Sequence, residues 1–211
     1  MIYLIGGPPR CGKTTLAKAL SNKLCISWVS CDTLDAVAKV YIPREQWRQR
    51  FPYSTLRREG GARDNDTFYR QHTARKIISV LKREARTTED AIETVIACEI
   101  ANGNDMIIEG YHLTPVFVSR MQKKYGKSCI RTVFLVKIDA EQFARDVQKS
   151  TTPNDWLLVL TKQQETFTRV GKMVALFSRQ IEEMAGKYTY MVFQMDMDFQ
   201  KNIQRAIKYL V

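Results

Sequence analysis

The sequence predicts an α/β protein built on a parallel five-stranded sheet with helices on both faces. Short apolar runs alternate along the chain with longer segments in which apolar residues recur at helical spacing, which is typical of a parallel sheet. A glycine- and proline-rich loop, Gly6-Gly7-Pro8-Pro9, separates the first apolar run from the first helical segment. The 211 residues are 45 % hydrophobic and 26 % charged, which is ordinary for a domain with a buried core.

The apolar runs and their end signals predict the positions of the elements. Acids in the turn after Thr88 suit the start of a helix, and Asn102-Gly103 suits the end of one. Thr33 can cap a helix, and Pro115 suits the first position of another. Strands are expected at residues 2–5, 26–30, 106–108, 131–138 and 189–195. Helices are expected at residues 13–24, 33–39, 66–86, 88–102, 115–126, 140–149, from a cap at Asn154 towards 186, and 198–210.

The chain is predicted to form a single domain, residues 1–211, that carries an insert. The stretch 33–102 is too long for one crossover between neighbouring strands, so it is predicted to be a helical subdomain that binds a second substrate. The stretch 41–86 is strongly basic: it holds ten Arg and two Lys against five acids, an excess of seven positive charges out of a net +11 for the chain. Such a patch favours anionic partners.

Several classes of protein are disfavoured by the same composition. No apolar run approaches the roughly eighteen residues that a membrane span needs, so no membrane partner is expected. No basic residue precedes the apolar N-terminal run, which is unlike a signal peptide. The five cysteines are scattered without a Cys-x-x-Cys pair, which favours a reduced, cytoplasmic protein without disulfides or zinc.

The segment Gly7-Pro8-Pro9-Arg10-Cys11-Gly12-Lys13-Thr14 fits the pattern G-x-x-x-x-G-K-[ST]. A predicted strand precedes it and a predicted helix follows, as the pattern requires. Backbone N–H groups of such a loop surround the phosphates of a nucleoside triphosphate, a lysine charges the β- and γ-phosphates, and a hydroxyl binds magnesium. The predicted nucleotide-binding residues are Gly7, Arg10, Cys11, Gly12, Lys13, Thr14 and Thr15.

With this loop the sequence resembles the P-loop kinases that act on small molecules and nucleotides. The Gly7-Pro8-Pro9 beginning looks like adenylate kinase, whereas Arg10 departs from that group, which usually has glycine there. The resemblance implies a P-loop kinase fold with strand order 2-3-1-4-5, and ATP with Mg²⁺ as the nucleotide substrate. Lys13 would then be catalytic as well as nucleotide-binding.

Asp32 follows the second predicted strand in the segment Ser30-Cys31-Asp32-Thr33. Parallel sheets bind ligands at the carboxyl ends of their strands, where a carboxylate can take the proton of an acceptor hydroxyl. The segment resembles the one in zeta-toxin kinases, chloramphenicol phosphotransferase and polynucleotide kinases, where an acid follows this strand. Asp32 is therefore a candidate catalytic and substrate-binding residue. The alternative is that Asp32 is an ordinary helix N-cap.

The third strand ends in Ile108-Glu109-Gly110-Tyr111-His112. An acid at the end of an apolar strand can hold magnesium through water, so Thr14 and Glu109 are the predicted metal site. The pattern resembles 2-phosphoglycerate kinase, phosphoribulokinase and uridine kinase. His112 is a candidate contact for an anionic substrate, and the alternative is a structural histidine.

Arg145 lies at the start of the helix after the fourth strand. In the kinases that the sequence resembles, arginines at this place belong to a lid that closes over the transferred phosphoryl group. Arg145 is thus the third predicted catalytic residue, with Lys149 where a second lid arginine is usual. A solvated helix face is the alternative.

The basic stretch supplies the predicted acceptor site through Arg44, Arg48, Arg57 and Arg58, with aromatic residues interleaved. Arginine forms paired hydrogen bonds with phosphate and carboxylate. The sequence therefore predicts an ATP-dependent kinase that phosphorylates a hydroxyl of a small anionic or nucleotide-like acceptor. The alternatives are a polynucleotide 5′-hydroxyl kinase, which would bind nucleic acid, a nucleoside monophosphate kinase, and a non-catalytic nucleotide-switched binding protein. The oligomeric state is left open.

Overall fold

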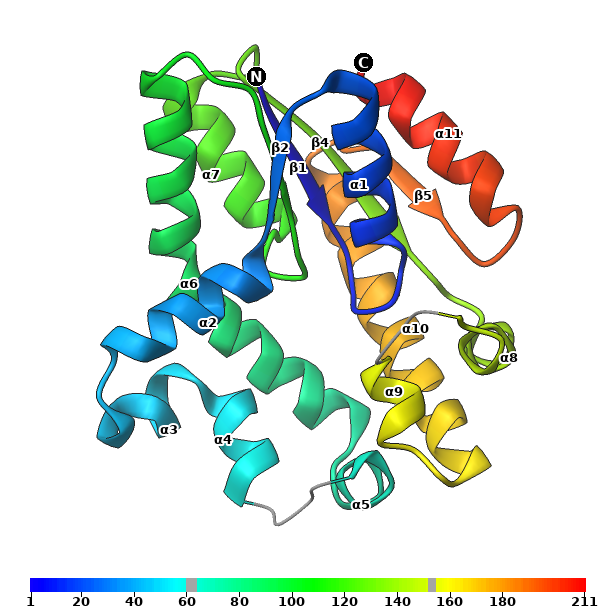
Figure 1. Cartoon of the computed structure of the whole chain (residues 1–211). Coiled ribbons are helices and arrows are strands. Elements are labelled where there is room, and N and C mark those ends of the chain that lie inside the picture. Colours follow the sequence, from blue (N-terminus) through cyan, green and yellow to red (C-terminus); the bar gives the residue numbers. More distant parts are fainter. Residues whose placement is uncertain (60–63, 152–154) are drawn as a thin grey trace.

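The computed structural model describes residues 1–59, 64–151 and 155–211, and it is an α/β protein with one parallel sheet (Figure 1). The strand order β2-β3-β1-β4-β5 confirms the predicted 2-3-1-4-5 arrangement. All four strand pairings are parallel. The strands are β1 (Ile2–Gly6), β2 (Ser27–Ser30), β3 (Met106–Glu109), β4 (Ile130–Val136) and β5 (Val192–Gln194).

The centre of the sheet is apolar because β1 is covered on both faces. Ile2, Leu4 and Ile5 are fully buried. Leu4 is in register with Ile108 of β3 on one side and with Thr132 of β4 on the other. A strand that is buried on both faces reads as a continuous apolar run, which is the pattern the sequence shows.

Helices cover both faces of the sheet. Helices α1 (Lys13–Leu24) and α11 (Phe199–Leu210) pack on one face, while α6 (Ala74–Ala101), α7 (Pro115–Tyr125) and α10 (Gln164–Lys187) pack on the other. Figure 1 shows the remaining helices beyond the lower end of the sheet, in two groups. One group is α2 (Cys31–Tyr41), the 3₁₀ turn η1 (Arg44–Gln46), α3 (Trp47–Arg50), α4 (Pro52–Glu59) and α5 (Asn65–Gln71), and the other is α8 (Ala140–Gln148) with α9 (Trp156–Val159).

The prediction that two helices, 66–86 and 88–102, are separated near Thr88 is wrong. The chain forms a short α5 and then one continuous α6 that passes through Thr88 without a break. Thr88 does not cap a helix, because its side chain is fully buried and its hydroxyl donates a hydrogen bond to Asp35 Oδ1 at 2.9 Å. A contact with a residue far along the chain thus overrides the local signal.

Two further predictions differ from the structure. The stretch after Tyr41, where no helix is predicted before residue 66, forms the short helices η1, α3 and α4. The long helix expected from Asn154 is interrupted: α9 ends at Val159 and α10 begins at Gln164. Asn154 itself lies outside the described residues. None of the helices within the described ranges has the length and hydropathy that crossing a membrane requires.

Helices α2–α6 lie between β2 and β3 in the chain, and apart from the first two residues of α2 they fall within the predicted insert 33–102. Ile92 and Ile96, in the second half of α6, belong to the same buried core as β1. The first half of α6 packs with α2 and α4. The helix therefore connects the core of the sheet with the helices that face its carboxyl end, where the candidate site lies.

Candidate functional site

The loop between β1 and α1 is shaped by two glycines that no other residue could replace without strain. Gly7 has φ +130°, and a Cβ atom there would lie 2.0 Å from the carbonyl oxygen of Leu135. Gly12 has φ +92°, and a Cβ atom there would lie 2.6 Å from the ring of Phe199. The loop can therefore pass close to β4 and α11 and present its backbone N–H groups at the N-terminus of α1, which is an anion-binding geometry.

Lys13 is held inside this loop. Its side chain is 8 % exposed, and its Nζ donates a hydrogen bond to the carbonyl oxygen of Pro8 at 2.7 Å. Cys11 is fully buried, and burial raises the pKa of its thiol to about 11. At neutral pH this thiol is therefore uncharged, so Cys11 can offer a ligand only its backbone.

Arg10 adopts the left-handed conformation, with φ 65°, at the position where the resembling kinases usually have glycine. Its guanidinium forms an ion pair with Asp155 at 2.6 Å, and the Asp155 side chain is only 1 % exposed. A left-handed conformation costs a non-glycine residue roughly 1–2 kcal/mol. The ion pair holds the side chain in place and helps to offset that cost.

Thr14 and Glu109 lie together, as the sequence predicts for a magnesium site. The Thr14 hydroxyl donates a hydrogen bond to Glu109 Oε1 at 2.9 Å, and Glu109 is 4 % exposed at the end of β3. A hydroxyl and a carboxylate are hard oxygen ligands of the kind that Mg²⁺ prefers beside phosphates. The donor set therefore fits a magnesium ion shared between these residues and a bound nucleotide.

Asp32 lies in the first turn of α2, beside the phosphate loop. Ser30, not Asp32 or Thr33, is the N-cap of this helix, because its hydroxyl oxygen accepts a hydrogen bond from the Asp32 backbone N–H at 3.2 Å. The Asp32 side chain therefore does not cap the helix, and it is 76 % exposed. Its pKa is raised, chiefly because surrounding protein displaces water; Lys13 lowers it and Glu109 raises it. The large exposure lets solvent screen these charges.

A buried charged cluster fixes α2 in this position. Lys39 contacts the carboxylates of Asp35 and Glu84, the latter at 3.0 Å. Glu84, on α6, also accepts hydrogen bonds from the backbone N–H and the hydroxyl of Ser54 on α4, at 2.8 and 2.6 Å. Together with the bond from Thr88 to Asp35, these contacts tie α2, α4 and α6 to one another. The cluster thereby determines where α2 presents Asp32.

His112 lies deeper than its predicted role in substrate binding requires. The side chain is fully buried and neither ring nitrogen has a hydrogen-bond partner among the described residues. Burial lowers its pKa to about 3, with smaller contributions from Lys13 and Lys39, so the ring is neutral at physiological pH. Its Nδ1 is 3.9 Å from Asp32 Oδ1. His112 therefore offers no charge to an anion, although it lies beside the candidate base.

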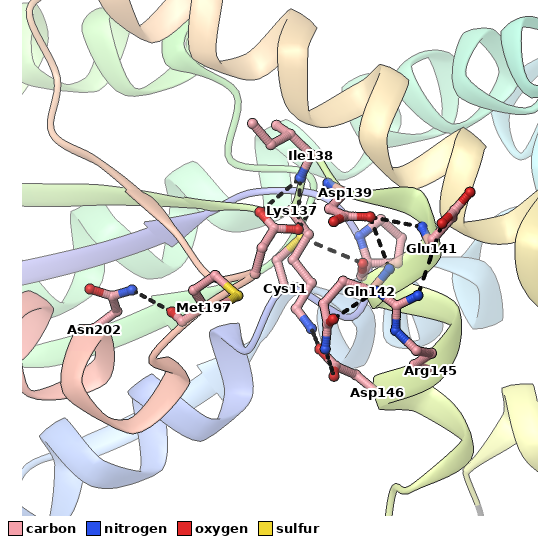
Figure 2. Close-up of polar contacts among 12 residues, drawn as sticks. Cys11, Lys137, Ile138, Asp139, Glu141, Gln142, Arg145, Asp146, Met197 and Asn202 are labelled. Carbon is pink, nitrogen blue, oxygen red and sulfur yellow. Dashed lines mark hydrogen bonds and ion pairs between the residues drawn. The ribbon is translucent and has the colours of Figure 1, made fainter.

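Figure 2 shows the turn from β4 into α8, which carries Arg145. Arg145 is half exposed and donates a hydrogen bond to Gln142 Oε1 at 2.9 Å on its own helix, and among the described residues it has no hydrogen bond or ion pair with the phosphate loop. Lys137, which the sequence did not single out, is 7 % exposed at the end of β4 and contacts Asp146 at 3.0 Å. Its charge also acts on Cys11 of the phosphate loop. The cation that lies beside the phosphate loop on this side is therefore Lys137, in place of the predicted Arg145.

The four predicted acceptor arginines do not form one cluster. Arg44, Arg48 and Arg58 line an open depression on the outer side of η1, α3 and α4. Arg48 is 81 % exposed and pairs with Glu59 at 3.1 Å, and Arg44 and Arg58 both lie over the ring of Trp47. The partners of these three arginines are thus side chains at the surface, Glu59 and Trp47.

Arg57 is different because it points inward. Its guanidinium lies 4.4 Å from the centroid of the Phe68 ring, and its Nη2 donates a hydrogen bond to Asn65 Oδ1 at 2.9 Å. Its Nη1 is buried without a hydrogen-bond partner among the described residues. Burial raises the pKa of the neighbouring Tyr53, and the charge of Arg57 lowers it. Arg57 and Asp32 lie on α4 and α2, the two helices that Glu84 ties together through Ser54 and Lys39.

No local pattern marks Asn65 or Asp155, which are buried and connect separate parts of the site. Each is a single polar residue in an unremarkable segment, and each acquires its role from partners about ninety residues or more away. A lysine at the end of an otherwise apolar strand, such as Lys137, is the one signal that could have been read locally.

The sheet order and the glycine-shaped loop define the fold of the P-loop kinases, with the loop at the carboxyl end of the central strand. Comparisons with known proteins agree with this class. A family model described as "ATPase family associated with various cellular activities (AAA)" matches residues 3–106, just under half of the chain. That segment includes the whole phosphate loop.

Among curated proteins, the chain is similar to a mevalonate-3-phosphate 5-kinase from Thermoplasma acidophilum, with 29 % identity over 124 residues. The match covers 58 % of this chain and 56 % of that protein, so the chain spans only about half the length of this relative.

Two solved structures share the fold. A gluconokinase from Sinorhizobium meliloti 1021 has a TM-score of 0.53 and 11 % identity, over 99 % of this chain and 90 % of that one. A sugar kinase from Janibacter sp. HTCC2649 has a TM-score of 0.50 and 13 % identity, over 99 % and 93 % of the two chains. At such low identity these similarities concern the fold alone.

Proposed function

We propose that this protein is a kinase that transfers the γ-phosphoryl group of ATP to a hydroxyl of a small anionic acceptor. The observation that carries the proposal is the exposed carboxylate of Asp32, whose charge interacts with that of Lys13 in the phosphate loop and whose helix is tied to α4, the helix that carries Arg57. A hydroxyl acceptor needs a group that can take its proton, and an anionic acceptor needs a cation. In this proposal Asp32 supplies the first and Arg57 the second.

The chain's own residues divide the chemistry as follows. Lys13 and the loop N–H groups bind the phosphates and stabilise the charge that spreads over them during transfer. Thr14 and Glu109 would hold Mg²⁺, which supplies further charge stabilisation when bound. Asp32 orients the acceptor hydroxyl and takes its proton, while Arg57 binds the anionic group at the other end of the acceptor. Lys137 adds positive charge beside the loop, and Arg145 could act only after α8 moves towards the nucleotide.

The proposed class of acceptor is based on the charged residues of the site and on one similar protein. The name of the Thermoplasma acidophilum protein describes a kinase of mevalonate 3-phosphate. Such a molecule carries a carboxylate, a phosphate and a free hydroxyl, which matches a site with an inward-facing arginine and a carboxylate base. We therefore propose a phosphorylated hydroxy acid as the acceptor.

A screen of ADP release by the purified full chain tests this proposal. Mevalonate 3-phosphate, mevalonate, 2-phosphoglycerate, nucleoside monophosphates and a 5′-hydroxyl oligonucleotide are offered separately with ATP and Mg²⁺. We expect ADP release that depends on a phosphorylated hydroxy acid. Release that depends only on a nucleoside monophosphate or on the oligonucleotide would replace the proposal with the corresponding kinase. Nucleotide binding without acceptor-dependent release in the whole panel would favour a nucleotide-switched binding protein.

Arg57→Ala should weaken acceptor binding far more than loss of a neighbouring surface arginine. A charged hydrogen bond contributes about 1.5–3 kcal/mol, so we expect the acceptor KM to rise by about 10- to 150-fold. The ATP KM measured at saturating acceptor should change little. Steady-state kinetics of the two substrates provides the measurement.

Arg50→Ala is the matched control, because Arg50 belongs to the same basic stretch but is exposed, and among the described residues its side chain hydrogen-bonds only to Gln46. Its acceptor KM should match that of the unchanged protein. An equal rise in both variants would mean that the patch attracts anions by its overall charge, with no special role for Arg57.

A further inference from the structure

One buried side chain connects the acceptor arginine to a distant segment. Asn65, the first residue of α5, is fully buried. Its Oδ1 accepts the hydrogen bond from Arg57, while its Nδ2 donates to the carbonyl oxygen of Trp156 at 3.1 Å and to the Thr161 hydroxyl at 3.0 Å. Its backbone N–H donates to the carbonyl oxygen of Leu160 at 2.8 Å. The amide of Asn65 thus holds Arg57 and residues 156–161 at once.

The same segment reaches the phosphate loop through Asp155. One carboxylate oxygen of Asp155 caps α9 by accepting a hydrogen bond from the Leu157 N–H at 3.1 Å. The other oxygen forms the 2.6 Å ion pair with Arg10. Because this carboxylate is almost completely buried, separating it from Arg10 would leave a desolvated charge, which is strongly unfavourable. The pair therefore keeps the segment and the loop together.

We propose that Asn65 is a positioning residue that couples the acceptor site to the phosphate loop. The path runs from Arg57 through Asn65 to residues 156–161, and from Asp155 to Arg10. The identity of the acceptor site in this inference rests on the proposed function, whereas the path of contacts does not depend on it. An acceptor anion that binds Arg57 restricts Arg57 and Asn65, and it thereby stabilises the arrangement in which Arg10 shapes the loop. By linkage, a nucleotide in the loop favours acceptor binding by the same factor.

The coupling can be measured with nucleotide alone, so the test does not depend on kinase activity or on the acceptor. Calorimetric titration of the full chain with magnesium and a non-hydrolysable ATP analogue gives the affinity of each variant. Asn65→Ala should weaken binding by about 5-fold or more, the lower range of coupling between sites. Thr161→Val removes the hydrogen bond between Asn65 and Thr161 but keeps Asn65 itself, and it should also weaken binding of the analogue. This variant replaces Asn65→Ala in the test if Asn65→Ala does not fold.

A double-mutant cycle separates coupling from a general loss of structure. The background Arg10→Gly/Asp155→Asn removes the ion pair without leaving a buried charge, and glycine suits the left-handed conformation at residue 10. In this background the effect of Asn65→Ala, or of Thr161→Val, on nucleotide affinity should disappear.

Asp66→Asn is the matched control, because Asp66 accepts hydrogen bonds from the N–H groups of Lys162 and Gln163 but, among the described residues, has no hydrogen bond or ion pair with Arg57 or Asp155. It should leave the affinity for the analogue within about 2-fold of the unchanged protein, since it lies outside the path from Arg57 to Arg10. Unchanged affinity in both Asn65→Ala and Thr161→Val, or an equal loss with and without the Arg10–Asp155 pair, would overturn the proposal and leave Asn65 as a structural residue.

Discussion

Lys13→Ala is expected to abolish measurable phosphoryl transfer while the fold remains intact. Lys13 is the cation that the loop holds against the phosphates, and its described side-chain hydrogen bond goes to the backbone of the same loop. Removing one preorganised donor from a transition state typically costs 10²–10³-fold in rate, and Lys13 also carries a full charge, so we expect a loss of at least about 10³-fold in kcat. ADP release measures the rate, and circular dichroism with thermal melting checks the fold.

Lys18→Ala is the control for Lys13→Ala. Lys18 lies on α1 as well, but it is exposed and contacts the ring of Trp28 at the surface. This variant loses the same charge and should keep its activity. A fully active Lys13→Ala protein would contradict the assignment of the loop as the phosphate site.

Asp32→Asn is expected to lower kcat by on the order of 10²–10⁴, the usual contribution of a general base. The substitution preserves the size of the side chain but removes the charge that takes the proton of the acceptor hydroxyl. Because Ser30 caps α2, the start of the helix should survive, and the favourable interaction of Asp32 with the helix dipole is worth only about 0.3–1 kcal/mol. The affinity for ATP should therefore change little.

The pH dependence of the same two proteins gives a second measurement. The base works only when ionised, so kcat of the unchanged protein should fall as the pH drops through the pKa of Asp32. That pKa is raised, so the fall should begin at a higher pH than an ordinary aspartate would give. Asp32→Asn should lack this decline.

Glu165→Gln is the control for Asp32→Asn, because Glu165 is an exposed acid in the first turn of α10. It should retain its activity. Near-normal kcat in Asp32→Asn, together with strong kinase activity, would exclude a hydroxyl acceptor. A phosphate acceptor is already ionised at neutral pH and needs no base, so the assignment would move to a nucleoside monophosphate kinase.

The parts of the molecule that could be predicted from the sequence are those encoded locally. The phosphate loop is a contiguous pattern in which Gly7 and Gly12 meet geometric demands that other residues cannot meet. The strands follow from short apolar runs. The order of the strands came from the resemblance to P-loop kinases, since no run of residues specifies which strand is its neighbour.

The remaining features depend on partners that are distant in the chain. Thr88 resembles a helix start until Asp35 is brought against it. Arg57 cannot be told from Arg58 by sequence, because the difference is whether the guanidinium faces Phe68 inside or Trp47 outside. His112 is polar in type, yet the fold buries it completely. In each case tertiary packing determined the role.

The continuity of α6 has a mechanical consequence for the site. At a rise of about 1.5 Å per residue, this 28-residue helix is a rod roughly 42 Å long with one end in the core of the sheet. Lys39, Glu84 and Ser54 fasten α2 and α4 to that rod with charged and hydrogen-bonded contacts. Because α6 is continuous, it contains no hinge about which α2 and α4 could rotate. The helix that carries Asp32 is therefore held in a fixed position. Because Asp155 and Asn65 also fasten α9, we expect any movement that narrows the space around a bound nucleotide to come from α8.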